Sequence, residues 1–389
     1  MKAIVNGKII TTSAIVEGKA LLFEDGKIVA LTDQVPSDAE TIDAAGNYVS
    51  PGFIDIHVHG GGGADFMDGS VDAFLVAARM HAKHGTTLIY PTTMTVRTEL
   101  LYETSEFFEK AKTIENDGAT LGGLHLEGPY FSMEKRGAQD PATIRNPKPE
   151  EYIPILDRCP GIARWSYAPE LEGAEEFAKE LTRRGVVASM GHTNAEFDDC
   201  ERAYQAGAKL MTHFYNCMST LHKVGIYRYP GAVEYGYYNS DVIAEAIADG
   251  IHVNPNSLKT LVSIKGRDGV ALITDTMRAA GMPDGPSVLG KLSEAYPVLV
   301  TDGAAMLPDK SALAASTATT DRLVRTMVQK AGCALVDAVY MASHTPAKAM
   351  GVLDRTGSLE PGKDADILIF DEGINIQQTI VRGRTVYKV

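Results

Sequence analysis

The chain has 389 residues, of which 44% are hydrophobic and 22% are charged, the proportions of an ordinary globular protein. Lys and Arg number 37 and Asp and Glu number 50, which gives a net charge of −13. This charge excludes nucleic acid and an anionic membrane as main partners, since both require a basic surface. An anionic ligand must therefore be held by a few local cations against the overall field.

The cysteines and the hydrophobic runs favour a protein of the reducing cytoplasm. The four cysteines are scattered and form no CxxC pair, which argues against a disulfide framework and against a thiolate zinc site. Residues 1–7 contain no apolar signal core. No apolar run approaches the roughly 18 residues of a membrane-spanning helix.

Both ends of the chain have the pattern of short strands. Turn signals such as Asn6-Gly7 and Asp25-Gly26 separate β-prone runs at 2–5, 8–10, 20–24, 27–31 and 41–43. The pattern returns at 366–370, 374–381 and 385–389. Neither end could bury a good core alone, so we expect residues 1–51 and 354–389 to form one discontinuous β-sandwich domain.

Residues 52–353 alternate strands with helices. The patterns predict helices at 72–84, 99–115, 174–184 and 195–206, and strands at 53–57, 86–90, 121–126, 186–190, 208–212, 242–248 and 269–274. Glycines that end helices just before the next strand indicate parallel βαβ units, and Pro91 is expected to end the strand 86–90. About seven or eight such units predict a (β/α)8 TIM-like barrel. An open doubly wound sheet is the alternative.

Two histidines stand at the end of the first strand of this middle region. In a parallel barrel the functional residues lie where the strands end. The strand ends Asp55-Ile56-His57-Val58-His59, and residues two apart on a strand point to the same face. His57 and His59 therefore converge, as two ligands of a metal ion would. Two hydrogen-bonded core histidines are the alternative.

A carboxylate and two more histidines end later strands. Glu127 precedes a Gly-Pro turn, while His192 and His213 are separated by about one helix and one strand, so they should lie on neighbouring strands. Together the three supply N/O ligands and leave room for water, the pattern of a catalytic metal site. His125 lies deeper on the strand of Glu127 and is interpreted as a packed or supporting histidine.

Asp275 ends the strand 269–274. A helix N-cap or a turn is the common use of an Asp at such a place. Beside metal ligands it becomes a candidate general base for the activated water.

In this order, the set His57/His59, Glu127, His192, His213 and Asp275 resembles the amidohydrolase superfamily, and more narrowly the N-acetylglucosamine-6-phosphate deacetylases. Any one motif is weak, but their joint occurrence over nearly the whole chain is highly specific. The segments that carry the resemblance are Pro-Gly-Phe-Ile-Asp (51–55), His-Leu-Glu-Gly-Pro (125–129), Arg-Gly-Ala-Gln (136–139), Gly-His-Thr-Asn-Ala (191–195), Thr-His-Phe-Tyr-Asn (212–216), Ala-Asp-Gly-Ile-His (248–252), Thr-Asp-Thr-Met (274–277), Gly-Met-Pro-Asp-Gly (281–285) and the return-strand region 357–367.

The resemblance implies a metal-dependent hydrolase. It implies a (β/α)8 barrel with a small β domain built from both ends, and Glu127, His192 and His213 as ligands of the principal divalent ion. His57 and His59 are both present here, so a second ion shared through Glu127 is expected; a mononuclear site is the alternative. Zinc is the first choice, and His/Glu ligation also allows iron, manganese or cobalt.

The reaction implied is hydrolysis of N-acetyl-D-glucosamine 6-phosphate to D-glucosamine 6-phosphate and acetate. The metal would activate water and polarise the acetamide carbonyl, while Asp275 serves as base and then as acid. A homodimer is implied as well. The resemblance also assigns a set of substrate-binding residues: Ala138, Asn216, Cys217, Arg228, His252 and Leu313.

Two departures from the family pattern bear on the substrate. The stretch 221–231 is longer by about four residues than its family counterpart, which makes Lys223 a rival of Arg228 for the phosphate. In the loop 311–316, which borders the substrate in the family, Ser311 and Ala315 replace glycines. The galactosamine epimer or another N-acyl compound is therefore the nearest alternative substrate, and a non-catalytic sugar-phosphate sensor is the alternative from a different class.

Overall fold

The structure, a computed structural model, describes residues 1–310 and 312–389. Within these ranges the centre is a barrel of eight parallel strands: β8 (Phe53–Val58), β11 (Thr86–Thr93), β13 (Leu124–Glu127), β14 (Ile162–Tyr167), β15 (Val187–Met190), β16 (Leu210–Met211), β19 (Ile243–Ile247) and β20 (Val270–Ile273). The strands pair in that order. The backbone N–H of Asp275 donates to the His57 carbonyl at 2.9 Å, which joins the last strand to the first. The predicted barrel is confirmed, and the open sheet was the wrong alternative.

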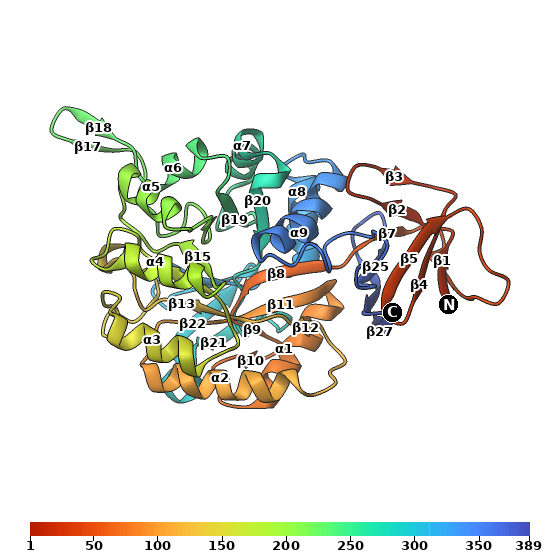
Figure 1. The fold of residues 1–389 in the computed structure, drawn as a ribbon, viewed down its shortest axis with the longest axis horizontal. Coiled ribbons are helices and arrows are strands. Elements are labelled where there is room, and N and C mark those ends of the chain that lie inside the picture. The colour runs from red at the N-terminus through yellow and green to blue at the C-terminus, as the bar shows by residue number, and fades with distance from the viewer. Residues whose placement is uncertain (311) are drawn as a thin grey trace.

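Helices surround the barrel (Figure 1). Each carries an apolar face, and Phe74, Ala77 and Ala78 of the first helix pack inward. Ser70 caps that helix by accepting from the Ala73 N–H at 3.2 Å, and Gly85 follows it with φ +88°, a turn that a β-carbon would strain. The helices are α1 (Val71–Lys83), α2 (Thr98–Lys112), α3 (Pro149–Arg158), α4 (Ala174–Arg183), α5 (Phe197–Gln205), α6 (Ala232–Tyr238), α7 (Pro255–Lys265), α8 (Thr320–Gln329) and α9 (Leu335–Ala349).

Three strand predictions in the barrel were wrong in detail. No strand was expected at 162–167, where β14 forms the fourth strand of the barrel. Pro91 does not end β11, because an irregularity in the pairing with β8 accommodates a residue without an N–H. The expected strand 121–126 is divided by Gly122-Gly123 into β12 (Thr120–Leu121) and β13.

Both ends of the chain meet at one end of the elongated molecule (Figure 1). A six-stranded sheet combines strands from the two ends, in the order β27 (Arg384–Lys388), β26 (Ile376–Val381), β25 (Ile367–Phe370), β7 (Tyr48–Pro51), β2 (Lys8–Ile10) and β3 (Ile15–Val16). A second sheet is built from the N-terminal end alone, in the order β5 (Lys27–Thr32), β4 (Ala20–Glu24), β1 (Lys2–Val5) and β6 (Glu40–Asp43). The sheets share one apolar core, which contains Ile4, Phe23 and Val49 beside Ile367 and Ile380. The discontinuous β domain is therefore present, while its limits at 1–51 and 354–389, and those of the barrel at 52–353, stay predictions.

Each expected terminal run is found within two residues of its predicted bounds, while β3 and β7 were not expected.

Excursions from the barrel were not foreseen from the sequence. An antiparallel sheet of β21 (Gly285–Leu289), β22 (Tyr296–Thr301), β23 (Ala304–Met306) and β24 (Leu313–Ser316) follows β20. The hairpin of β17 (His222–Val224) and β18 (Tyr227–Tyr229) projects from the body, and β9 (Gly60–Gly61) pairs with β10 (Ala64–Asp65). Among the described residues, no helix is long and apolar enough to cross a membrane.

Candidate metal centre and active site

The chemistry-bearing side chains gather where the barrel strands end. His57 belongs to β8 and Glu127 to β13, while His192, His213 and Asp275 follow β15, β16 and β20. The last three have φ angles of +47°, +31° and +50°. Left-handed backbone at three non-glycine residues in one place marks strain that functional sites often retain.

Glu127, His192 and His213 lie together. We call them the second ligand group because they follow His57 and His59 along the chain; they are the residues to which the resemblance assigns the principal ion. The Nε2 atoms of the two histidines lie 2.9 Å apart, and Glu127 Oε1 is 3.3 Å from that of His192 and 3.1 Å from that of His213. All three side chains are buried. β15 and β16 are paired neighbours, as the spacing of the histidines predicted.

His57, His59 and Asp275 form the first ligand group. Asp275 Oδ1 lies 3.4 Å from His57 Nε2 and 3.2 Å from His59 Nε2. Glu127 faces this group too, since its Oε1 is 3.3 Å from His57 Nε2 and its Oε2 is 3.6 Å from His59 Nε2. One carboxylate thus lies between the two groups, as a shared ligand would.

The donor set fits divalent metal ions. Among the described residues, His57 Nε2 is buried without a hydrogen-bond partner, although it points at two carboxylates. In the second group two imidazole nitrogens and a carboxylate oxygen converge, and a cation between them would satisfy all three lone pairs. Imidazole and carboxylate ligands are those that zinc and other first-row metals accept.

Hydrogen bonds orient the ligands. The Lys135 carbonyl lies 2.8 Å from His192 Nδ1, which makes that nitrogen the donor and leaves Nε2 free to coordinate. His125 behaves as predicted, because Thr92 and Ser166 engage both of its nitrogens at 3.1 and 2.7 Å. It therefore offers no free lone pair to an ion.

Charge dominates the protonation of the cluster. Burial alone would raise the pKa of each carboxyl and lower that of each imidazole. The neighbouring histidines nevertheless hold the pKa of Glu127 well below its usual range, and His57 and His59 lower that of Asp275 to about 2. In return, Asp275 and Glu127 raise the pKa of His57 to about 10 against the effect of burial. Without metal, the ionised carboxylates of Glu127 and Asp275 thus face a protonated His57, and a divalent ion would replace its proton. Burial lowers the pKa of His213 instead.

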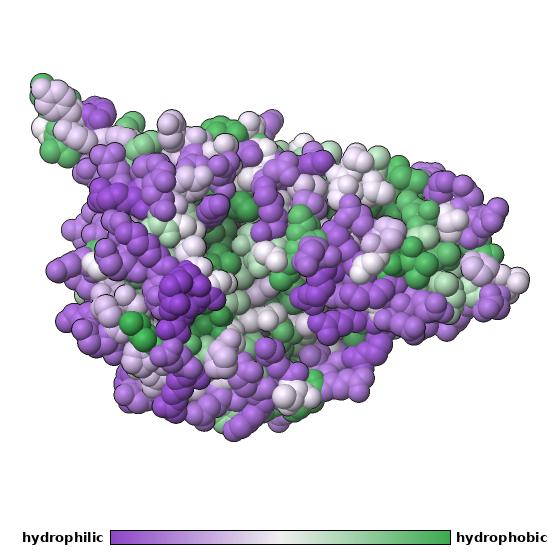
Figure 2. Space-filling view, in the orientation of Figure 1, coloured by the Kyte–Doolittle hydropathy of each residue, from purple (hydrophilic) through white to green (hydrophobic). Residues whose placement is uncertain are grey.

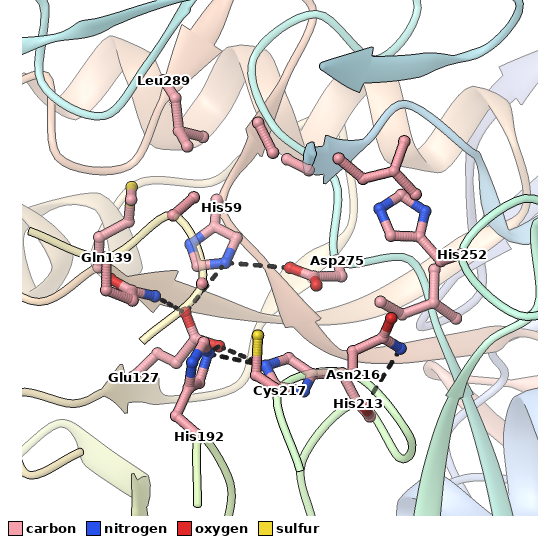
Figure 3. A pocket seen from close by; sticks show the side chains of 17 residues that line it. His59, Glu127, Gln139, His192, His213, Asn216, Cys217, His252, Asp275 and Leu289 are labelled. Atoms are coloured by element: carbon pink, nitrogen blue, oxygen red, sulfur yellow. Dashed lines mark hydrogen bonds and ion pairs between the residues drawn. The ribbon is translucent and has the colours of Figure 1, made fainter. Parts of the chain in front are cut away.

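All of the ligand residues except His57 line a pocket of about 120 Å³ (Figure 3). Its wall includes all but one of the predicted substrate-binding residues: Ala138, Asn216, Cys217, His252 and Leu313. His252 lies across the pocket from the metal ligands (Figure 3), and Asp249 Oδ2 holds its Nδ1 at 2.7 Å. Of the two altered residues of the loop 311–316, Ala315 lines the pocket and Ser311 lies outside the described residues.

Arg228 is not placed where the resemblance put it. It lies exposed on β18, opposite Lys223 of β17, and neither residue lines the pocket. Figure 2 shows the hairpin standing clear of the body at the upper left. The extra residues in this stretch build the projecting hairpin, so within one chain neither cation reaches the pocket.

Sequence reasoning missed Gln139 at the pocket wall. Its Oε1 accepts hydrogen bonds from the Thr95 N–H and hydroxyl at 2.9 and 3.0 Å, so its Nε2 must face Glu127 Oε2, at 2.6 Å. Figure 3 shows the amide directed at the carboxylate. Its place in the Arg-Gly-Ala-Gln segment was the only signal available in the sequence. A polar residue in a loop follows no helix or strand periodicity that would predict where its side chain points.

Fold and site together define a metal-dependent hydrolase built on a (β/α)8 barrel. The chain belongs to the amidohydrolase family, whose model matches residues 48–386. It is accordingly an enzyme that acts on amide C–N bonds.

The relatives narrow this class. The chain is 34% identical to N-acetylglucosamine-6-phosphate deacetylase of Bacillus subtilis over 97% of this chain and 95% of that protein. It is 33% identical to N-acetylgalactosamine-6-phosphate deacetylase of Escherichia coli O157:H7, over 97% of each. The crystal structure of N-acetylglucosamine-6-phosphate deacetylase from Pasteurella multocida superposes with a TM-score of 0.92 at 31% identity, over 99% of both chains.

Proposed function

We propose that this chain hydrolyses the acetamide of N-acetyl-D-glucosamine 6-phosphate to D-glucosamine 6-phosphate and acetate. The observation that carries the proposal is the convergence of Asp275 and two ligand groups that share Glu127 beside a pocket. The names of the relatives supply the substrate class.

We assign Asp275 the proton transfers. Its carboxylate is ionised at neutral pH, because His57 and His59 hold its pKa at about 2. It can take a proton from the attacking water while the water oxygen bonds to the acetamide carbon. When the C–N bond breaks, Asp275 returns the same proton to the leaving nitrogen, so the products are a free amine and acetate.

Both ligand groups would hold a divalent ion, with zinc as the proposed metal. A bound ion supplies Lewis acidity, which polarises the carbonyl, acidifies water and offsets negative charge in the transition state. Glu127 would be shared between the two ions, and Gln139 holds its second oxygen in place.

The sugar phosphate would extend from the metal ligands toward His252. Asp249 orients the His252 ring, and the ring in its imidazolium form would donate from its other nitrogen to a phosphate oxygen. Asn216, Cys217, Ala138 and Leu313 would contact the sugar from the remaining wall.

The phosphate requires a further cation, and we assign it to a second copy of the chain. No Lys or Arg lines the described part of the pocket, while Arg228 and Lys223 project on the hairpin. In a homodimer the hairpin of one copy would bring Arg228 to the pocket of the other. Arg228 is preferred over Lys223 because its guanidinium binds phosphate with two hydrogen bonds. The cytoplasmic location expected from the sequence stays a prediction.

The test is acetate release from both phosphorylated epimers and from their unphosphorylated forms. We expect the highest kcat/KM on N-acetyl-D-glucosamine 6-phosphate and loss of activity with a chelator. Faster hydrolysis of the galactosamine epimer would favour the second candidate, which the Escherichia coli relative supports. Binding of the substrate without acetate release by the metal-loaded chain would indicate a sensor.

A further inference from the structure

A layer of charged and polar side chains lies inside the barrel beneath the ligand groups. Its centre is the pair of Arg164 on β14 and Glu245 on β19, both completely buried and in contact. Burying such a pair is expensive, and apolar residues often stabilise a fold as well or better. The interior of a barrel of this kind is commonly filled by branched apolar side chains, so the pair calls for another explanation.

Glu245 contacts both ligand groups from below. Its Oε2 lies 3.3 Å from His57 Nδ1 and accepts a hydrogen bond from the backbone N–H of His213 at 3.0 Å. Its Oε1 accepts from Arg164. Each of its oxygens thus faces a group that can only donate, the Arg164 guanidinium or the His213 N–H, so the Glu245 carboxylate acts as an acceptor. His57 Nδ1 must therefore carry the proton.

Arg164 anchors the same two ligand strands. It donates to the carbonyl of Ile56, the residue before His57, at 3.0 Å. It also donates to the hydroxyl of Thr212, the residue before His213, at 3.1 Å. One guanidinium thus binds the residue before His57, the residue before His213 and the carboxylate of Glu245.

We propose that Glu245, held in place by Arg164, is a positioning residue that prepares the first ligand group to bind its ion. By accepting the proton of His57 Nδ1, it commits the ring to the tautomer whose Nε2 lone pair points at Asp275 and Glu127. The partnerless Nε2 is the atom left for the metal. This inference rests on the proposed metal site, but not on the identity of the substrate.

The deciding experiment counts ions rather than turnover. Zn²⁺ is titrated calorimetrically into chelator-stripped chain, and the equivalents bound are checked by elemental analysis. The wild-type chain should bind two equivalents. In Glu245→Gln an NH₂ must face a donor, either Arg164 or the pair His57 and His213. We expect the ion of the first group to bind about 10- to 100-fold more weakly, as for other partners of metal-bound histidines, with the second retained.

A double variant separates positioning from folding. Arg164→Met combined with Glu245→Leu removes both buried charges, and such replacements usually fold. It leaves His57 Nδ1 without an acceptor, so it should lose the same ion. The matched control is Asp366→Asn, an isosteric change at a buried carboxylate of the terminal sheets that accepts from Thr356 and the Arg382 N–H; it should bind two equivalents normally.

Three results would overturn the inference. The first is two equivalents bound by the folded double variant with wild-type affinities, and the second is equal weakening of both ions in Glu245→Gln. The third is a single equivalent in the wild-type chain. Acetate release by the wild-type chain is measured separately, so failure of the proposed function would be recognised on its own.

Discussion

The proposed metal end and the proposed phosphate end of the pocket are built from different parts of the fold. At the metal end, buried side chains lie at the ends of barrel strands, where His192 donates to the Lys135 carbonyl and the His213 N–H donates to Glu245 of β19. At the phosphate end, His252 and Asn216 come from loops, and the described lining contains no Lys or Arg. The barrel strands thus position the proposed metal ligands, while in our proposal substrate recognition depends on loops and on a second chain.

Removing the metal should give the largest effect, and it should affect hydrolysis without affecting phosphate binding. We expect a chelator to abolish hydrolysis, because both ligand groups lose the ion that activates water. Binding of D-glucosamine 6-phosphate should persist, since in our proposal His252 and Arg228 hold the phosphate without metal. Acetate release and calorimetry on the same stripped sample measure the two. Full activity in a sample shown to be metal-free would contradict the assignment.

Asp275→Asn should affect only the metal end. An amide cannot accept the proton of the attacking water, so kcat should fall by about 10²- to 10⁴-fold, the usual contribution of general acid–base catalysis. KM and fold should change little. Steady-state kinetics measure the effect, with circular dichroism as the control. Turnover near the wild-type rate would refute the assigned role.

Arg228→Ala should affect only the phosphate end. Losing charge-assisted hydrogen bonds worth about 1.5–3 kcal/mol should raise KM by about 10- to 100-fold and spare kcat. Lys223→Ala, on the facing strand of the hairpin, is the matched control. The reverse pattern would assign the phosphate to Lys223. An unchanged KM in both variants would remove the hairpin, and with it the second chain, from the site.

The pH dependence of metal binding gives the most graded effect, which is the smallest of the four for a change of one pH unit. His57 has its pKa raised to about 10 in the metal-free chain, so at neutral pH it carries a proton that a metal ligand must lose. Apparent affinity should therefore rise with pH up to about 10, by about tenfold per unit for each proton released. Zn²⁺ titrations in buffers of different ionisation enthalpy count the protons. Binding without proton release would contradict the charge state described for the site.

The phosphate end was harder to predict than the metal end. The ends of parallel barrel strands all lie at the same face of the barrel. Residues at those ends are therefore expected to lie close together, and they include His57, His59, Glu127 and Asp275. The position of Arg228 depends on the path of a loop. A few extra residues in that loop form a hairpin, which carries Arg228 away from the pocket. Glu245 and Gln139 escaped notice because their importance lies in contacts with residues remote in the chain.

The sequence by itself determined the barrel, the sharing of a β domain between both ends and the set of candidate metal ligands. Periodicity, glycine placement and strand-end residues are local properties, and they survive without knowledge of the packing. Only the tertiary structure decided that Glu127 lies between two ligand groups, that a buried Arg164–Glu245 pair lies beneath them and that Arg228 lies outside the pocket. Those facts depend on distances between strands and on loop paths, which the order of residues does not display.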